Sequence, residues 1–401
     1  MAIQAVGPAK RELPAVWTLA FRPFFLAAGL WSAAALLLWV AMLAHGEALA
    51  SRFNPLSWHI HEMLFGFVLA AIAGFMLTAI PNWTGREPIR GGALAGLAGL
   101  WLLGRIACLT SAWWPFSLAA AADLAFPVAL CAVALREIVA ARNWRNLPMP
   151  APIAALGVAD LLMHLESGGF GVPQGLGWRL GVAAVIVLIS VVGGRIIPAF
   201  TRNWLAKRGE PRLPVLKGFV DRAALGTLHA GLILWAFLPV SRPIGALLLL
   251  AAALNLWRVS RWRGAATRTE PLLWILHVGY LWVAVGAALL GASMLTQAVP
   301  VAASIHALTA GAIGTMVLAV MTRVSLGHTG RPLAADRTTV AIYLLVNAAA
   351  VVRIVAEVVG GASFLPLIEL SGALWAGGYG LFVIWYGPIL LTPRADRRAP
   401  A

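Results

Sequence analysis

The sequence predicts an all-α protein that crosses a membrane many times. The chain has 401 residues, of which 61% are hydrophobic and 11% are charged, and its mean hydropathy is +0.86. A soluble globular protein of this composition would expose mostly apolar surface to water. Apolar runs of about 20 residues, the length that a helix needs to cross the hydrocarbon core, recur along the whole chain. We therefore expect a single transmembrane domain over residues 1–401.

Apolar runs bounded by proline, glycine, arginine or polar clusters predict twelve transmembrane helices. No small-residue cleavage site follows the first run, so we expect that run to stay in the protein as a helix. The bundle occupies 24–391, between a cytoplasmic N-terminal segment, 1–23, and a cytoplasmic tail, 392–401. The predicted helices span 24–45, 57–80, 91–109, 115–138, 152–166, 177–200, 219–239, 243–262, 271–295, 301–324, 339–358 and 365–391.

The positive charge of the chain predicts its orientation in the membrane. The 30 Lys and Arg residues exceed the 15 Asp and Glu residues, giving a net charge of +15. Such an excess in a soluble protein would indicate nucleic acid, but here it gathers in short segments between apolar runs, so we expect no nucleic-acid partner. With both termini in the cytoplasm, only five basic residues lie away from cytoplasmic segments: Arg52, Arg105, Arg179, Arg242 and Arg353.

An internal repeat links the second and tenth predicted helices. "HEMLFGFVLAAIAGFMLTAIPNWTGR" starts at His61 and "HALTAGAIGTMVLAVMTRVSLGHTGR" starts at His306, and the two starting numbers differ by 245. "IPNWT" (80–84) also resembles "IPAFT" (197–201) in the sixth helix. We therefore predict three pseudo-symmetric groups of four helices, with sites where the repeats face one another. The alternative is that "TGR" is only a helix stop, with a glycine cap and an arginine at the headgroups.

Histidines on the outer side of the bundle are the first candidate ligands, because ionisable groups in the hydrocarbon region are costly. His59 and His61 lie about 200° apart around a helix and cannot chelate one metal together. The repeat pairs His61 with His306, and two opposed imidazoles suit the axial ligation of a haem. His59 is then free for copper, a haem propionate or a second site, with Glu62 orienting an imidazole. The alternative is a wet, interfacial hydrogen-bond cluster.

Two other histidines on the predicted outer side and both cysteines are weaker candidates for a binding site. His45 and His164 border loops, where we expect them to be solvated. Cys108 and Cys131 lie in apolar segments without a CxxC or CxxCH motif, so we expect packing rather than a disulfide or covalently attached haem.

The cytoplasmic ends of the sixth and tenth helices predict a separate polar region. His306 and His328 are roughly 33 Å apart along a helix and cannot share one metal. We expect Arg195 and Arg323 to lie below the lipid headgroups, where a guanidinium suits an anion such as a haem propionate. For the arginines nearest the membrane surface, the alternative is that the side chain extends to the lipid phosphates. His277 and His328 are candidates for a second metal site, and His229 for a hydrogen bond inside the bundle. The predicted anion-binding residues are Arg195 and Arg323, supported by Arg202 and Asn203.

Six motifs of the chain resemble the NnrS family, and they cover essentially its whole length. They are "FRPFF" (21–25), "WHIHEMLFGF" (58–67), "PNWTGR" (81–86), "GGRIIPAFTRNW" (193–204), "EPLLWILHVGY" (270–280) and "HALTAGAIGTMVLAVMTRVSLGHTGRPL" (306–333). The resemblance implies a multi-pass protein of the bacterial cytoplasmic membrane that contains non-covalent, b-type haem and copper. It also implies a role in nitric oxide metabolism, denitrification and defence against nitrosative stress.

A more distant resemblance is to the catalytic subunit of haem–copper oxidases and nitric oxide reductases. That subunit also has twelve helices in three arcs, with haem ligands on its second and tenth helices. Its copper-ligating histidines lie on the sixth and seventh helices, where this chain offers only His229. This difference from the related subunits argues against a standard haem–copper centre and against oxygen reduction.

The expected function is to bind or reduce nitric oxide at a haem, with electrons from quinol or a redox protein. A haem with two histidine ligands is coordinatively saturated, so reduction needs a second site with an open position. The alternative is a membrane transporter whose histidines and arginines bind a metal complex or an anion without redox turnover. No catalytic residue is assigned.

The predicted orientation can be tested with a reporter that is active only outside the cytoplasm. Alkaline phosphatase fused after Gly209 should be inactive, whereas the same enzyme fused after Phe170 should be active, because the basic loop at 201–218 is expected to stay inside. The reverse pattern of activities would contradict the orientation.

Overall fold

The computed structural model describes residues 13–215 and 218–397, and this part of the chain is helical without strands. The predicted N-terminal segment, 1–23, and tail, 392–401, therefore lie partly outside the described residues. Short 3₁₀ turns occupy Ala15–Trp17, Ser111–Trp113, Trp144–Asn146, Gly264–Thr267, Gly361–Ser363 and Ala395–Arg397.

The first half of the bundle begins with a helix that buries three aromatic side chains of the "FRPFF" motif. The second predicted helix is composite: α2 begins after Asn54, whose Oδ1 accepts a hydrogen bond from the Ser57 N–H at 2.9 Å, and passes into a π-helical segment, η2. The elements are α1 (Phe21–His45), α2 (Pro55–His61), η2 (Glu62–Val68), α3 (Leu69–Thr84), α4 (Gly92–Thr110), α5 (Phe116–Ala140) and α6 (Ala151–Ser167).

The second half contains the other composite helix, in which a π-helical segment, η6, joins α11 to α12. The Asp336 carboxylate caps α13 by accepting a hydrogen bond from the Thr339 N–H at 2.8 Å. The elements are α7 (Leu176–Ala206), α8 (Phe219–Phe237), α9 (Arg242–Ser260), α10 (Pro271–Leu295), α11 (Val301–His306), η6 (Ala307–Gly314), α12 (Thr315–His328), α13 (Arg337–Val359) and α14 (Phe364–Leu391).

Eleven helices of the described residues are long and apolar enough to cross a membrane. This confirms a multi-pass, all-α protein. The predicted helix 219–239 is present as α8 but is not among the eleven, because Asp221, Arg222 and His229 lower its hydropathy. The count of twelve spans and the orientation of the termini therefore stay predictions.

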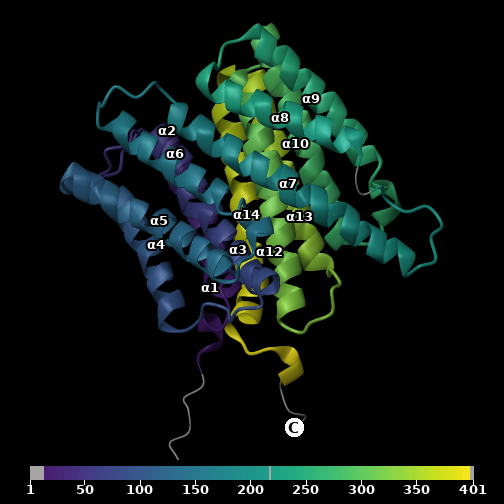
Figure 1. Ribbon diagram of the computed structural model, residues 1–401. Helices are drawn as coiled ribbons and strands as arrows, with labels where there is room; N and C mark the ends of the chain where they lie inside the picture. The colour runs from purple at the N-terminus through teal and green to yellow at the C-terminus, as the bar shows by residue number, and fades with distance from the viewer. Residues whose placement is uncertain (1–12, 216–217, 398–401) are drawn as a thin grey trace, which may run out of the picture.

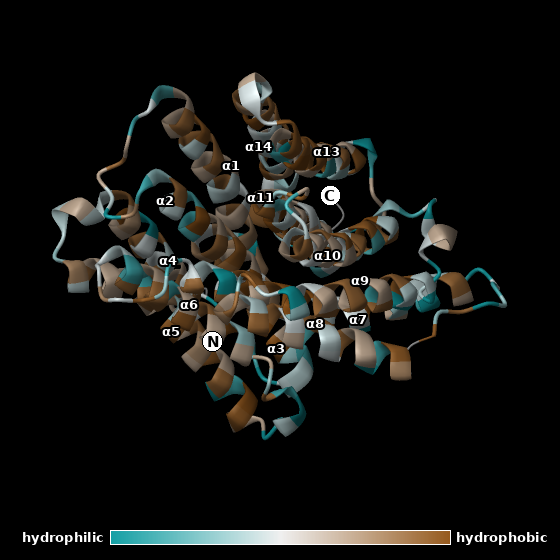
Figure 2. Cartoon of the chain, turned by 90° about the horizontal axis from the view of Figure 1, so that it is seen from above, coloured by the Kyte–Doolittle hydropathy of each residue, from teal (hydrophilic) through white to brown (hydrophobic). Residues whose placement is uncertain are grey.

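The helices form three lobes (Figure 2). Seen from above, α4 to α6 lie on one side, α7 to α9 on another, and α13 and α14 on a third, with hydrophilic residues gathered mainly in the connections (Figure 2). The composite helices lie inside the bundle: α3 packs against α1 and α12, and η6 packs against α7 and α10 (Figure 1). The pseudo-symmetry of the three groups stays a prediction.

The two π-helical segments start at equivalent places in the internal repeat. One begins directly after His61 and the other directly after His306, which differ by 245 in residue number. π-helical turns are rare and occur frequently at functional sites, because the extra residue turns the side chains before it relative to those after it. The two repeated segments therefore share a π-helical backbone as well as a similar sequence.

Glycines inside both π-helical segments allow close packing. A Cβ on Gly66 would lie 2.5 Å from Trp31 Nε1 and 2.8 Å from Arg105 Nη1, and a Cβ on Gly311 would lie 2.6 Å from a Trp282 ring carbon. Gly66 and Gly311 are equivalent in the repeat, and each allows a tryptophan side chain to pack directly against the backbone of its composite helix.

Gly66→Ala should lower the free energy of unfolding by about 1–3 kcal/mol, because the new methyl group has no room beside Trp31 and Arg105. Gly99→Ala is the matched control, since nothing lies within 4 Å of a Cβ at that helical position, and alanine should stabilise the helix by up to about 1 kcal/mol. Unfolding of both variants in detergent checks the difference. Equal stability of the two variants would contradict the packing at Gly66.

Candidate metal centre

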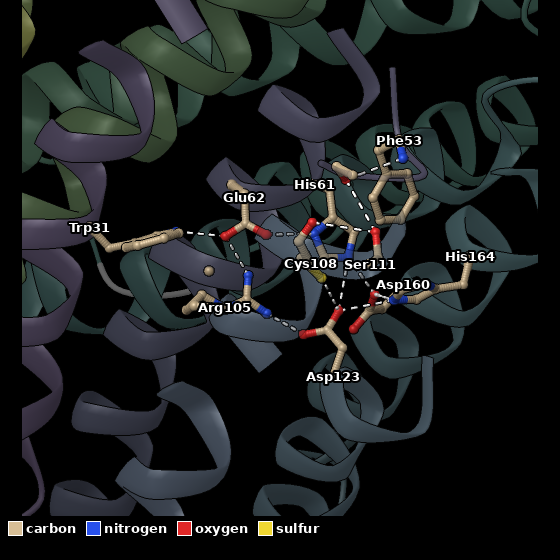
Figure 3. A network of polar contacts seen from close by, with 12 residues as sticks. Trp31, Phe53, His61, Glu62, Arg105, Cys108, Ser111, Asp123, Asp160 and His164 are labelled. Carbon is tan, nitrogen blue, oxygen red and sulfur yellow. Dashed lines mark hydrogen bonds and ion pairs between the residues drawn. The ribbon is translucent and has the colours of Figure 1, made fainter. Parts of the chain in front are cut away.

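Five elements bring a group of ionisable side chains together near the start of the first composite helix (Figure 3). His61 is the last residue of α2, and Glu62 begins η2. The helical spacings of three and four residues place Arg105 with Cys108 on one face of α4, and Asp160 with His164 on one face of α6. Asp123 on α5 lies between them. All seven side chains are buried.

The imidazole of His61 is surrounded by carboxylates. Its Nε2 lies 2.8 Å from Asp160 Oδ1 and 3.0 Å from Asp123 Oδ2, and its Nδ1 lies 3.1 Å from Glu62 Oε1. Ionised carboxylates only accept hydrogen bonds, so both ring nitrogens need either a proton or a metal ion between them and the oxygens.

His164 and Cys108 complete the group around Asp123. His164 Nε2 lies 3.1 Å from Asp123 Oδ2, and the Cys108 thiol donates to the same oxygen at 3.3 Å. One ligand atom from each of His61, Cys108, Asp123 and His164 lies within 4.8 Å of every other. The four residues therefore have the donor atoms and the spacing for one metal ion.

Arg105 and Trp31 hold the carboxylates that surround His61. Arg105 Nη1 and Trp31 Nε1 each donate to Glu62 Oε2 at 2.7 Å, and Arg105 Nη2 donates to Asp123 Oδ1. Glu62 is thereby fixed against His61 Nδ1. A carboxylate that orients a histidine in this way is typical of metal sites.

The charges of this group do not balance without an added cation. Glu62, Asp123 and Asp160 are within 1% of full burial, and Arg105 is the guanidinium that contacts Glu62 and Asp123. With neutral imidazoles, three carboxylates against one guanidinium leave two negative charges. Buried charges are costly unless they are paired or coordinate a metal. One divalent cation, or a proton on each imidazole, would supply the missing charge.

Two observations favour the metal ion over the two protons. Asp160 Oδ2 is buried without a hydrogen-bond partner, which a metal or its bound water would supply. The group also contains the Cys108 thiol, whose sulfur can bind a metal as well as donate to Asp123. Imidazole and thiolate ligands together select copper or zinc rather than magnesium or calcium.

A large cavity lies beside this centre and contains two other predicted site residues. Its volume is about 1010 Å³, and His59 and His306 both line it, while His61 does not. His306 Nδ1 lies 2.7 Å from the Ala302 carbonyl, so that this nitrogen carries the proton and Nε2 keeps its lone pair. His59 stacks on Trp39 with ring centroids 4.2 Å apart, and its Nδ1 is buried without a partner.

The repeat predicts that His61 faces His306 across the bundle, but none of the contacts of His61 described above is with His306. The repeat fixes the register of the two histidines along their helices, but it does not fix the direction in which each points. Asp123 and Asp160 both contact Nε2 of His61 on one side of the helix. As the 200° separation requires, His59 points elsewhere, and it is His59 that shares a cavity with His306.

The predicted residues at the cytoplasmic ends do not line this cavity, whose arginines are Arg179 and Arg353. Arg323 lies over the Phe200 ring, with its guanidinium carbon 4.2 Å from the centroid. Arg195, Arg202 and Asn203 are exposed.

The predicted pair of inner histidines have different neighbours. His277 Nε2 lies 2.9 Å from Thr201 Oγ1, whereas the His328 ring lies 5.7 Å from that of Phe21. His229, as expected, hydrogen-bonds inside the bundle, at 2.7 Å from Ser190 Oγ.

Sequence reasoning missed most of the centre. His164, expected in solvent, is 4% exposed, whereas His45 is exposed as predicted. Cys108 is buried as expected but bonds to Asp123 rather than only packing. The available signal was the pair of acidic residues, Asp123 and Asp160, inside apolar runs, since an ionisable residue within a membrane span indicates function.

Comparison with known proteins agrees with the motifs quoted above. The family described as NnrS protein matches residues 15–394. The chain belongs to the NnrS family. No curated protein matches it significantly. Membership connects this helical membrane protein with nitric oxide, and its buried centre of histidine, cysteine and aspartate could hold a metal.

Removal of a ligand should empty the metal centre of this NnrS protein. His164→Ala and Asp123→Asn should each reduce the bound copper or zinc to background, and Glu62→Gln should weaken its binding about 10–100-fold, because Glu62 orients His61 without joining the ligand set. The metal content of purified protein, measured by mass spectrometry, checks this. His45→Ala is the control and should keep full metal content; equal metal in His164→Ala and the parent would contradict the site.

Proposed function

We propose that this NnrS family member is a haem- and copper-containing membrane protein that binds or reduces nitric oxide. The observation that carries the proposal is the pair of imidazoles, His59 and His306, lining one large cavity next to a buried metal centre. Family membership supplies the connection to nitric oxide.

The size and lining of the cavity fit a haem. Its volume of about 1010 Å³ lies at the upper end of the range for small-molecule sites, roughly 300–1,000 Å³. Most of its lining is apolar and includes Trp39, Phe67 and Trp375, as a flat macrocycle requires. His306 offers a ring nitrogen with its lone pair free, and the buried Nδ1 of His59 lacks a partner. These unpaired nitrogens are what an iron atom would satisfy.

Arginines in the cavity lining are the proposed partners of the haem carboxylates. Arg353 pairs with Glu357, and both line the cavity; Arg179 donates through Nε to the Ala236 carbonyl at 2.9 Å, which leaves its terminal nitrogens free. We assign the carboxylates to Arg179 and Arg353 in place of Arg195 and Arg323, which do not line the cavity.

The number of histidines on the iron decides between the two activities. When bound, haem would supply an iron that carries electrons or takes up a diatomic ligand. His306, held by Ala302, is the residue proposed to hold the haem permanently. If His59 held the iron as well, the protein would be restricted to electron transfer, whereas a free His59 would allow nitric oxide to bind.

Copper is the proposed occupant of the buried centre, held by His61, Cys108, Asp123 and His164. Glu62, which contacts His61 Nδ1, would set the tautomer that leaves Nε2 for the metal. The cytoplasmic membrane of a bacterium is the proposed location, and quinol or a redox protein the proposed electron donor. Nitric oxide consumption by the reduced, purified protein, with identification of the product, distinguishes reduction from binding.

The haem ligands are tested by absorption spectroscopy of the purified protein. His306→Ala should lose the Soret band or lower it at least tenfold, because it removes the proposed permanent ligand. His59→Ala should keep haem, and a shift from low-spin to high-spin iron would show that His59 also binds. His45→Ala, an exposed histidine, should leave the spectrum unchanged. Colourless parent protein, the result that a transporter would give, or an unchanged band in His306→Ala would contradict the assignment.

A further inference from the structure

A second, smaller cavity lies where α3, α7 and α12 approach one another. Its volume is about 70 Å³. Its lining consists of aliphatic, aromatic and methionine side chains and one glycine, without a single polar side chain. The cavity is open on one side, and a water molecule inside it would find no hydrogen-bond partner among these side chains.

The small cavity adjoins the large one. Val68, the last residue of η2, lines both, so one side chain lies between the two spaces. A molecule that leaves the small cavity past Val68 therefore enters the cavity lined by His59 and His306.

The opposite side of the small cavity faces out of the bundle near the middle of the membrane. Val192, Val320 and Phe75 line it and are only half-buried, although the helices that carry them are central. Val68 and Phe75 lie close to the midpoint of the spanning segment Pro55–Thr84. The outward side is thus at the depth of the hydrocarbon core.

We propose that this small cavity binds a small, uncharged diatomic gas from the hydrocarbon core and passes it by Val68 to the large cavity. The gas is nitric oxide in the function proposed above, on which the destination depends; carbon monoxide and oxygen share its size and low polarity. Ions and hydrogen-bonding solutes are excluded, because they would enter without a single polar partner.

Gas binding is tested with xenon, a neutral probe that occupies dry apolar cavities. Purified protein under xenon pressure should show one bound atom among Val68, Val192 and Val320. Val192→Phe, which extends a half-buried side chain into the space, should abolish it, and Val128→Phe should not, since Val128 is 64% exposed on α5. Absence of xenon from the parent protein would overturn the proposal, and this result does not depend on haem.

The route is tested by carbon monoxide binding to the reduced haem after flash photolysis. Val192→Phe should slow the association rate constant at least fivefold, and Val68→Ala, which widens the contact between the cavities, should raise it at least threefold, with the Soret band unchanged in both. Val128→Phe should match the parent. Rate constants that stay at the parent value in both test variants would overturn the route. A protein without haem would refute the function proposed above while the xenon test still decides the gas site.

Discussion

The need to balance charge inside the membrane organises one lobe of this protein. Arg105 on α4 joins Glu62, at the start of the first composite helix, to Asp123 on α5. Each of these side chains would be costly in hydrocarbon alone, so they fix the positions of three helices relative to one another. Removing one member would leave its partners buried and unpaired, at a cost of about 3–5 kcal/mol. The same network holds His61 in its orientation.

The orientation of His61 separates two sites that begin on one short stretch of chain. Its Nε2 contacts carboxylates from α5 and α6, while His59, on another side of the same helix, stacks on Trp39 and lines the large cavity. The π-helical segment follows at once, and Gly66 within it lets Trp31 approach Glu62. One turn of helix thus supplies an imidazole to the candidate metal centre and another to the large cavity.

The central helices change character with depth. Beside His61 the bundle encloses imidazoles and carboxylates, whereas the small cavity around Val68 and Val192 is lined only by apolar side chains and one glycine. Arg323 lies beyond Met321, the last residue of α12 that lines this cavity. This difference follows from the bilayer. A polar group costs little free energy near the interface, whereas in the hydrocarbon core it is found only where other polar groups pair with it.

The sequence by itself determined the multi-pass helical fold, because bilayer thickness sets the length of a span and hydropathy reports it directly. It also determined the separation of His59 from His61 around their helix, since this follows from helical rotation. Only the tertiary structure decided which way each imidazole points and what it meets. Asp123, Asp160 and His164 reach His61 from helices distant in sequence, and no local period encodes that contact. The candidate metal centre therefore depends on how the helices pack, whereas the spans follow from the local composition of the chain.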